Sequence, residues 1–151
     1  MIIAFGCDHA GFDYKSRIIE YLNSRGDKVL DCGCFSKESC DYPDYALPVA
    51  EYVSNKKCDK GILVCGTGVG MSIAANKVYG IRAAVCYNDD IAKLVREHND
   101  ANVLCLSARF APVEDTLKWI KTWLDTPFSG EQRHLKRINK ITEIDRKCRR
   151  K

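Results

Sequence analysis

Five short apolar runs recur along this chain, and each is followed by a stretch with helical periodicity. The runs occupy residues 2–6, 28–32, 61–65, 82–86 and 103–107. They are continuously apolar rather than alternating, a pattern typical of parallel strands that are buried on both faces. Regular alternation of strand and helix predicts a parallel sheet covered by helices on both sides.

The stretches between and after these runs predict six helices. The first carries Tyr14, Ile18, Ile19 and Leu22 on one face and ends at Gly26. The others begin at Pro43, near Val69, near Asp89, after Pro112 and near Gly130, and the last ends near Arg146. We therefore expect an α/β fold, a three-layer Rossmann-like sandwich with a five-stranded parallel sheet and an extra C-terminal helix. The length of 151 residues favours one domain over residues 1–151.

Cysteine usage and the amino-terminal residues indicate the compartment. The chain has nine cysteines, an odd count, and its first residues lack the basic and long apolar segments of a secretory signal. These features favour reduced thiols and a cytoplasmic location. No run approaches the roughly 18 consecutive apolar residues of a membrane-spanning helix, so we expect no association with a membrane.

The net charge of +4 is concentrated at the carboxyl terminus. Residues 133–151 hold nine Lys or Arg and two acidic residues, a net +7 that leaves residues 1–132 at −3. Such a segment can bind nucleic acid, an anionic membrane or an acidic small substrate. No aromatic residue is interleaved with it after Phe128, which disfavours nucleic acid. We expect residues 146–151 to form a solvated basic tail.

The segment Cys65-Gly66-Thr67-Gly68-Val69-Gly70 lies where a ligand is expected. Ligands of parallel α/β sheets bind beyond the carboxyl ends of the strands, and this segment follows the third run. Its alternate glycines allow a tight turn whose amides can face an anion. It lacks the Lys of a Walker A loop, and Met71 replaces the third glycine of a dinucleotide-binding fingerprint. A purely structural strand-to-helix turn is the alternative.

Cys65 precedes this loop at a predicted helix N-terminus, where the helix dipole stabilises a thiolate. It is therefore a candidate base or nucleophile. The alternative is a small buried hydrophobe, which is what we expect of Cys7, Cys86 and Cys105.

His98 lies on the apolar stripe of the fourth predicted helix and is followed by Asn99. We expect this pair near the same sheet edge as Asp8 and His9, which follow the first run. An Asp-His pair at a strand end favours a functional role, whereas a lone inward-facing His is more often a satisfied core residue.

Arg133 and Arg137 lie four residues apart on the last predicted helix and therefore share one face. Two guanidinium groups beside an apolar stripe can clamp a phosphate dianion. Two solvated surface charges are the alternative. Arg109 follows the fifth run, at the edge where ligands are expected.

Six segments together resemble the ribose-5-phosphate isomerase B family. They are Gly6-Cys7-Asp8-His9-Ala10-Gly11, Asp41-Tyr42-Pro43, Cys65-Gly66-Thr67-Gly68-Val69-Gly70, Ala74-Ala75-Asn76-Lys77, Gly80-Ile81-Arg82-Ala83 and His98-Asn99-Asp100-Ala101-Asn102. The likeness spans residues 2 to about 145, in the same order and at similar spacing. Each motif is weak by itself, but the ordered set is highly specific.

This resemblance implies an aldose–ketose isomerase that uses no metal and no organic cofactor. Cys65 would move a proton between C1 and C2 of the sugar, while Thr67 and the glycine-loop amides hold the enediolate oxygens. His98 would assist ring opening. The positions implied to bind the sugar phosphate are Asp8, His9, Tyr42, Gly66, Thr67, Gly68, Val69, Gly70, Asn99, Arg109, Arg133 and Arg137. The resemblance also implies a homodimer with shared active sites, or a tetramer built from such dimers.

Two other functions stay open. Galactose-6-phosphate isomerase subunits share the fold, and a hexose phosphate such as allose 6-phosphate could be the substrate. The presence of Cys65, His98, Arg133 and Arg137 favours the pentose phosphate. A non-enzymatic phosphate- or nucleotide-binding module is disfavoured, because the fourth run ends at Cys86 rather than at an acid that could bind a ribose hydroxyl.

Overall fold

The computed structural model describes residues 1–148, and within them the chain forms five strands and six α-helices. The strands are β1 (Ile2–Cys7), β2 (Lys28–Asp31), β3 (Lys60–Cys65), β4 (Ala83–Val85) and β5 (Val103–Ser107). The helices are α1 (Phe12–Ser24), α2 (Pro43–Ser54), α3 (Val69–Ala75), α4 (Asp89–Glu97), α5 (Val113–Asp125) and α6 (Gln132–Cys148), with a 3-10 turn η1 (His9–Gly11) before α1. The predicted strands and helices are confirmed.

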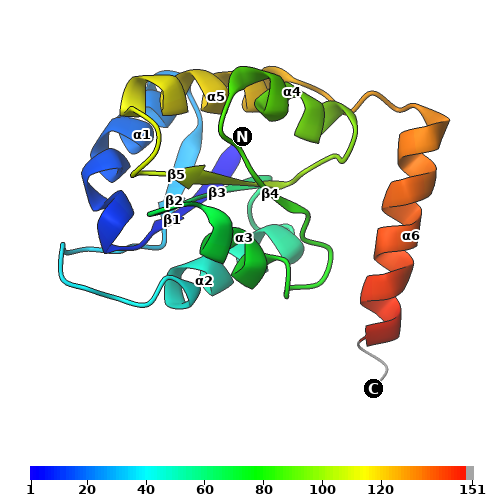
Figure 1. Ribbon diagram of the computed structural model, residues 1–151, viewed down its shortest axis with the longest axis horizontal. Helices are drawn as coiled ribbons and strands as arrows, with labels where there is room; N and C mark the ends of the chain where they lie inside the picture. Colours follow the sequence, from blue (N-terminus) through cyan, green and yellow to red (C-terminus); the bar gives the residue numbers. More distant parts are fainter. Residues whose placement is uncertain (149–151) are drawn as a thin grey trace.

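The strands form one parallel sheet in the order β2-β1-β3-β5-β4. Helices α1, α4 and α5 cover one face of this sheet, and α2 and α3 cover the other (Figure 1). This arrangement confirms the predicted three-layer α/β fold. The chain leaves β1 toward one side of the sheet and β3 toward the other. The carboxyl ends of these two neighbouring strands therefore form the switch point at which such folds bind ligands.

The central strands owe their position to their uninterrupted apolar runs. In β3, Ile62 and Val64 pack under α1, α4 and α5, while Leu63 and Cys65 pack under α2 and α3. Each fully buried Ile, Leu or Val contributes about 1.5–3 kcal/mol relative to an exposed one. The residues that follow β3 are thus carried on a strand that is buried on both faces.

Helix α6 is set off from the layered body, at the far end of the segment that follows α5 (Figure 1). It continues to Cys148, so residues 146–148 of the predicted basic tail are helical, and their side chains are exposed. Arg146 Nε donates to the Tyr79 hydroxyl at 3.5 Å. Residues 149–151 of the predicted tail lie outside the described residues. Within residues 1–148, no helix is both long and apolar enough to cross a bilayer.

Candidate active site

The thiol of Cys65 lies at the carboxyl end of β3 and is only 4% exposed. The backbone N–H of Gly68 donates to Cys65 Sγ at 3.1 Å, and a donor aimed at this sulfur stabilises negative charge on it. Gly68 can do so because it has a φ of +79°, in the left-handed region. A Cβ at position 68 would also come within 3.1 Å of the Leu106 backbone. The left-handed conformation of Gly68 is therefore what brings a loop amide onto the Cys65 sulfur.

Ser107, the last residue of β5, fastens this loop to the next one. Its buried hydroxyl donates to the Gly66 carbonyl at 2.8 Å and accepts from the amides of Arg109 and Phe110 at 3.3 and 3.0 Å. The Arg109 side chain lies directly against Gly66, since a Cβ on that glycine would be 3.2 Å from Arg109 Nε. An exposed guanidinium group thus lies against the loop residue that follows Cys65.

Asp8 and His9, which follow β1, lie at the same sheet edge as Cys65. The Asp8 amide donates to the Val64 carbonyl at 3.1 Å, next to Cys65. The buried Asp8 carboxylate accepts from the amides of Ala10 and Gly11, at 2.9 and 3.2 Å, and so caps η1. This cap holds the turn against the end of β3.

The ring of His9 is oriented by the loop between β2 and α2. His9 Nδ1 accepts a hydrogen bond from the Cys40 amide at 3.2 Å. A neutral His9 ring therefore carries its proton on Nε2, which leaves that atom as the donor toward a ligand.

Tyr42 and Thr67 complete this side of the site. Tyr42 stands at the start of α2, with its ring against Gly70 of the loop. Thr67 is exposed, and its hydroxyl accepts from the Val69 amide at 3.2 Å. We call the residues gathered here the carboxyl-edge group: Asp8, His9, Tyr42, Cys65, Gly66, Thr67, Gly68, Val69, Gly70 and Arg109.

His98 and Asn99 are not part of this group, and the expectation that they share its sheet edge is wrong. Helix α4 starts after the carboxyl end of β4 and runs back, so it ends beside the amino ends of the strands. Arg82, which precedes β4, donates to the Asn99 carbonyl at 3.0 Å. The Gly61 amide, near the start of β3, donates to the Asn102 carbonyl at 2.9 Å. A strand of this length separates these residues from Cys65 by roughly 17 Å.

The His98 ring stacks on the ring of His134 from α6, with centroids 4.2 Å apart and planes 14° from parallel. His134 is 3% exposed, and its Nε2 has no hydrogen-bond partner among the described residues. Burial lowers the pKa of His134, and the nearby His98 and Arg133 lower it further. The neutral ring is therefore favoured in this stack.

The stack joins His98 to α6, the helix that carries Arg133 and Arg137, the two residues predicted to bind phosphate. Arg133 and Arg137 share a helix face with Lys136 and Lys140, and these four line a hollow of about 310 Å³. Arg133 Nε donates to Glu131 at 2.7 Å. We call His98, Asn99, Arg133 and Arg137 the amino-edge group.

Cys7 at the end of β1, Cys86 just after β4 and Cys105 in the middle of β5 behave as buried hydrophobes, as predicted. Cys7, Cys86 and Cys105 have no exposed surface. Burial raises the pKa of all three thiols, that of Cys86 to about 11. Within residues 1–148, no group of three or more His, Cys, Asp or Glu side chains is arranged to hold a metal ion.

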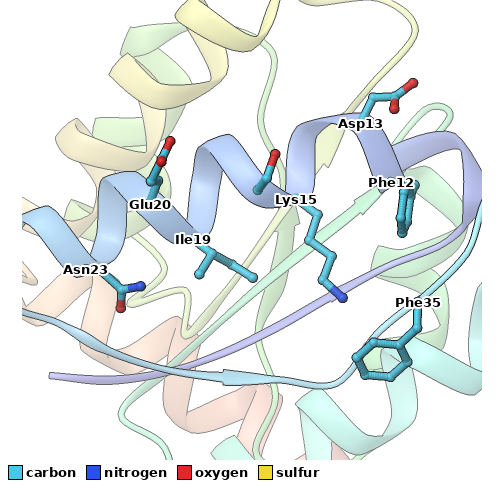
Figure 2. Close-up of a pocket in the computed structure, with 8 residues that line it drawn as sticks. Phe12, Asp13, Lys15, Ile19, Glu20, Asn23 and Phe35 are labelled. Atoms are coloured by element: carbon cyan, nitrogen blue, oxygen red, sulfur yellow. The ribbon is translucent and has the colours of Figure 1, made fainter.

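A separate cavity of about 540 Å³ runs along α1 (Figure 2). Its lining residues are Phe12, Asp13, Lys15, Ser16, Ile19, Glu20, Asn23 and Phe35, and no predicted site residue is among them. The predicted site residues instead form two separated groups in one chain. Of the amino-edge group, Asn99 lines a hollow of about 320 Å³, and Arg133 and Arg137 line the one of about 310 Å³ described above.

Three residues that support the site were not predicted to do so: Ser107, His134 and Cys40. Ser107 was the only polar residue of its run, at the ligand-binding edge, and that signal could have identified it. The contacts of His134 with His98 and of Cys40 with His9 join residues more than 30 positions apart. Spacing along the chain carries no signal for such contacts.

Comparison with known proteins identifies the family to which the chain and its fold belong. Residues 3–141 match the ribose/galactose isomerase family. The chain is 48% identical to ribose-5-phosphate isomerase B of Escherichia coli K12, over 96% of this chain and 97% of the relative. A solved ribose-5-phosphate isomerase B from Clostridium thermocellum superposes with a TM-score of 0.95 at 50% identity, covering 97% and 99% of the two chains. The Mycoplasma genitalium enzyme with bound ribulose 5-phosphate gives a TM-score of 0.92 at 41% identity, with 96% of each chain covered. This chain therefore belongs to the ribose/galactose isomerase family.

Proposed function

We propose that the protein interconverts ribose 5-phosphate and ribulose 5-phosphate through an enediolate, at sites that two copies of the chain share. The observation that carries this proposal is the Cys65 thiol, held at the β1/β3 switch point with the Gly68 amide on its sulfur. The similarity over the whole chain to ribose-5-phosphate isomerases B supports the choice of substrate.

In this proposal Cys65 acts as the base. It removes the proton from C2 of open-chain ribose 5-phosphate and returns it to C1. The hydroxyl proton on the C2 oxygen passes to the C1 oxygen, so C1 gains a hydroxyl and C2 a carbonyl. One base serves both carbons because they are adjacent. The Thr67 hydroxyl and the loop amides donate to the enediolate oxygens as charge develops on them. Asp8 and Tyr42 hold the sugar near its reacting end.

The amino-edge group supplies the remaining functions from the second copy. His98 assists ring opening by proton transfer, with Asn99 as an additional hydrogen-bonding side chain. Arg133 and Arg137 bind the phosphate together with His9 and Arg109 of the first copy. Charge-assisted bonds from guanidinium groups suit a phosphate dianion. No metal or organic cofactor takes part in these steps.

The separation of the two groups supports a homodimer. A single chain holds them about one strand length apart, roughly 17 Å, which is too far for one pentose phosphate to touch Cys65 and His98 together. Apolar side chains are also exposed on α6, which carries Arg133 and Arg137, and on α3, which follows the glycine loop. Ile141 and Ile144 of α6 are 41% and 59% exposed, and Val69 and Ile73 of α3 are 50% and 57% exposed. Association that covers such surface is favourable.

Mixing two defective variants, assayed at a ribose 5-phosphate concentration far below the KM of the Arg variant, tests the shared site. Cys65→Ala lacks the base, and the double variant Arg133→Ala/Arg137→Ala lacks the proposed clamp from the other edge. After unfolding and refolding together, about half of the dimers are hybrids, and each hybrid has one intact site, so about a quarter of wild-type activity should return. No recovery in the mixture would contradict a site shared in this way.

Assays with three sugar phosphates test the substrate. We expect ribulose 5-phosphate to form from ribose 5-phosphate with a higher kcat/KM than either hexose phosphate gives. A preference for allose 6-phosphate or galactose 6-phosphate would favour the hexose alternative within this family. We also propose a cytoplasmic location, because nine cysteines without a disulfide, one of them the proposed base, suit a reducing compartment.

A further inference from the structure

Three thiols that the proposed reaction does not use cluster around His9. Cys7 Sγ lies 3.8 Å from Cys34 Sγ, and the thiol of Cys34 also interacts with that of Cys40. Cys40 Sγ is 3.9 Å from His9 Nδ1. Cys34 and Cys40 delimit a loop between β2 and α2, and the hydroxyl of Tyr45 interacts with the Cys40 thiol.

The three thiols differ in access to an oxidant. Cys7 and Cys34 are 0% and 2% exposed, and burial raises the pKa of both thiols. Cys40 is partly exposed and stands beside an imidazole nitrogen whose lone pair already faces its backbone. A peroxide in solution therefore meets the Cys40 thiol first, because oxidation follows thiolate character and exposure.

Cys34 is the fixed partner. The Lys15 ammonium group donates to the Cys34 carbonyl at 2.7 Å and also pairs with Asp31 at 2.7 Å. Figure 2 shows Lys15 reaching from α1 toward the loop, where it lies over the Phe35 ring at 4.1 Å. The Cys34 amide donates to the Cys7 carbonyl at 2.7 Å. Closing a bond between the two thiols therefore moves Cys40 rather than Cys34.

We propose that hydrogen peroxide converts Cys34 and Cys40 into a reversible disulfide, and that this bond weakens substrate binding through His9. The Cys40 thiol gives up its proton and its sulfur attacks one peroxide oxygen; the O–O bond breaks, a sulfenic acid forms, and the departing hydroxide takes up the proton to leave as water. The Cys34 thiol then gives up its proton and attacks the sulfenic sulfur; the S–S bond forms, the S–O bond breaks, and the departing hydroxide takes up that proton as a second water. Two thiols and one peroxide thus give one disulfide and two waters.

The effect on the site follows from the contacts of Cys40. Its amide orients His9 through Nδ1, and the disulfide draws Cys40 from His9 toward Cys34. The part of the inference that concerns activity rests on the proposed function, in which His9 binds the phosphate. The chemistry of the thiols does not depend on that function.

Tryptic mapping of the peroxide-treated full-length protein tests the bond. Cleavage after Lys28, Lys37 and Lys56 places Cys34 in peptide 29–37 and Cys40 in peptide 38–56. After blocking of free thiols with N-ethylmaleimide, these two peptides should stay linked until dithiothreitol is added. Fragmentation should assign the bond to Cys34 rather than Cys32. A link between peptides 1–15 and 29–37 would instead identify Cys7 as the partner and overturn the proposal.

Kinetics of the same samples test the consequence. Peroxide should raise KM for ribose 5-phosphate by about tenfold, the effect of one lost hydrogen bond to a charged group, and dithiothreitol should restore it. Cys40→Ser should show neither the link nor the rise, whereas Cys58→Ser, a buried thiol on the other sheet face, should respond like the wild type.

Equal loss of kcat in the wild type and in Cys40→Ser, with no rise in KM, would locate the damage at Cys65 and overturn the proposal. Formation of the link without a reversible rise in KM would overturn it too. If the reduced enzyme did not isomerise ribose 5-phosphate at all, the proposed function would fail, while the linked peptides would still report on the thiols.

Discussion

The ring of Tyr42 occupies the space that a side chain on Gly70 would need. A Cβ at position 70 would lie 2.6 Å from Tyr42 Cζ, although α2 and α3 belong to different parts of the chain. We therefore expect Gly70→Ala to displace Tyr42 and to lower kcat/KM by about tenfold, with no loss of helix stability, because Ala favours α3 more than Gly does.

The control is the same substitution in a Tyr42→Ala background. Two residues in contact show non-additive effects, so Gly70→Ala should there change kcat/KM by less than about twofold. Full additivity of the two substitutions would mean that Gly70 acts through something other than Tyr42.

Replacing Cys65 with Ala should abolish isomerisation while folding is retained. The thiol is the proposed base, and its loss removes the group that carries the proton in this proposal. Residual activity within about tenfold of the wild type, a barrier change of about 1.4 kcal/mol, would rule this role out. Cys105→Ala, which removes a buried thiol of the neighbouring strand, is the matched control and should keep kcat while lowering thermal stability.

Arg133→Ala and Arg137→Ala should each raise KM for ribose 5-phosphate by about ten- to a hundredfold, the worth of a hydrogen bond to a charged group. The phosphate is remote from C1 and C2, so its binding energy is largely the same in the ground state and the transition state and appears in KM. Lys at either position should rescue only partly. Lys136→Ala and Lys140→Ala, on the same helix face, should leave KM unchanged. An unaltered KM in the double Arg variant would show that these arginines are only surface charges.

Treatment with EDTA should leave turnover unchanged. The proposed steps rely on a thiol, a hydroxyl, amides and guanidinium groups, and the described residues hold no set of three or more ligands that could bind a metal ion. The measurement is the initial rate before and after dialysis against the chelator. Inactivation that one divalent metal reverses would contradict the prediction.

Lys60 should make stability depend on pH above neutrality. Its ammonium group lies over the Trp123 ring at 5.0 Å. Burial, and then the like charge of Arg96, lowers the pKa of Lys60 to about 8, with Arg82 adding to this and Asp100 and Asp59 opposing it. Between pH 8 and the ordinary value of 10.5 the unfolded chain binds a proton that the folded protein has lost. The contribution of Lys60 to the free energy of unfolding therefore rises with pH in this window.

Urea unfolding of the wild type and of Lys60→Met measures this contribution. The stability of the variant relative to the wild type should fall by about 1 kcal/mol between pH 7 and pH 10, after allowance for screening of a partly exposed group. A difference that stays constant over this range would show that Lys60 titrates normally in the folded protein.

The local sequence pattern determined the strands and helices, and also the part of the site that lies at the carboxyl ends of the strands. The continuous apolar run at residues 61–65, for example, specifies a strand buried on both faces. The alternate glycines after it favour a tight turn of the backbone. Those features act over a few residues, so Cys65, Thr67 and the loop could be placed at a ligand-binding edge before any packing was known. The same argument placed Asp8, His9 and Arg109 there, because the carboxyl ends of all strands in a parallel sheet lie at the same edge.

The alternation of strands and helices already implied that the candidate residues are divided between the two sheet edges, because a helix that follows a parallel strand runs back across the sheet. His98 at the end of α4 therefore lies about one strand length from Cys65, and only the tertiary structure decided that it stacks on His134. The order of the strands, the Cys40 amide on His9 and the Ser107 brace likewise depend on segments brought together by burial of the two core layers. Burial of apolar surface is non-directional. Because of this, the spacing of residues along the chain does not reveal which distant side chains come into contact when that surface is buried.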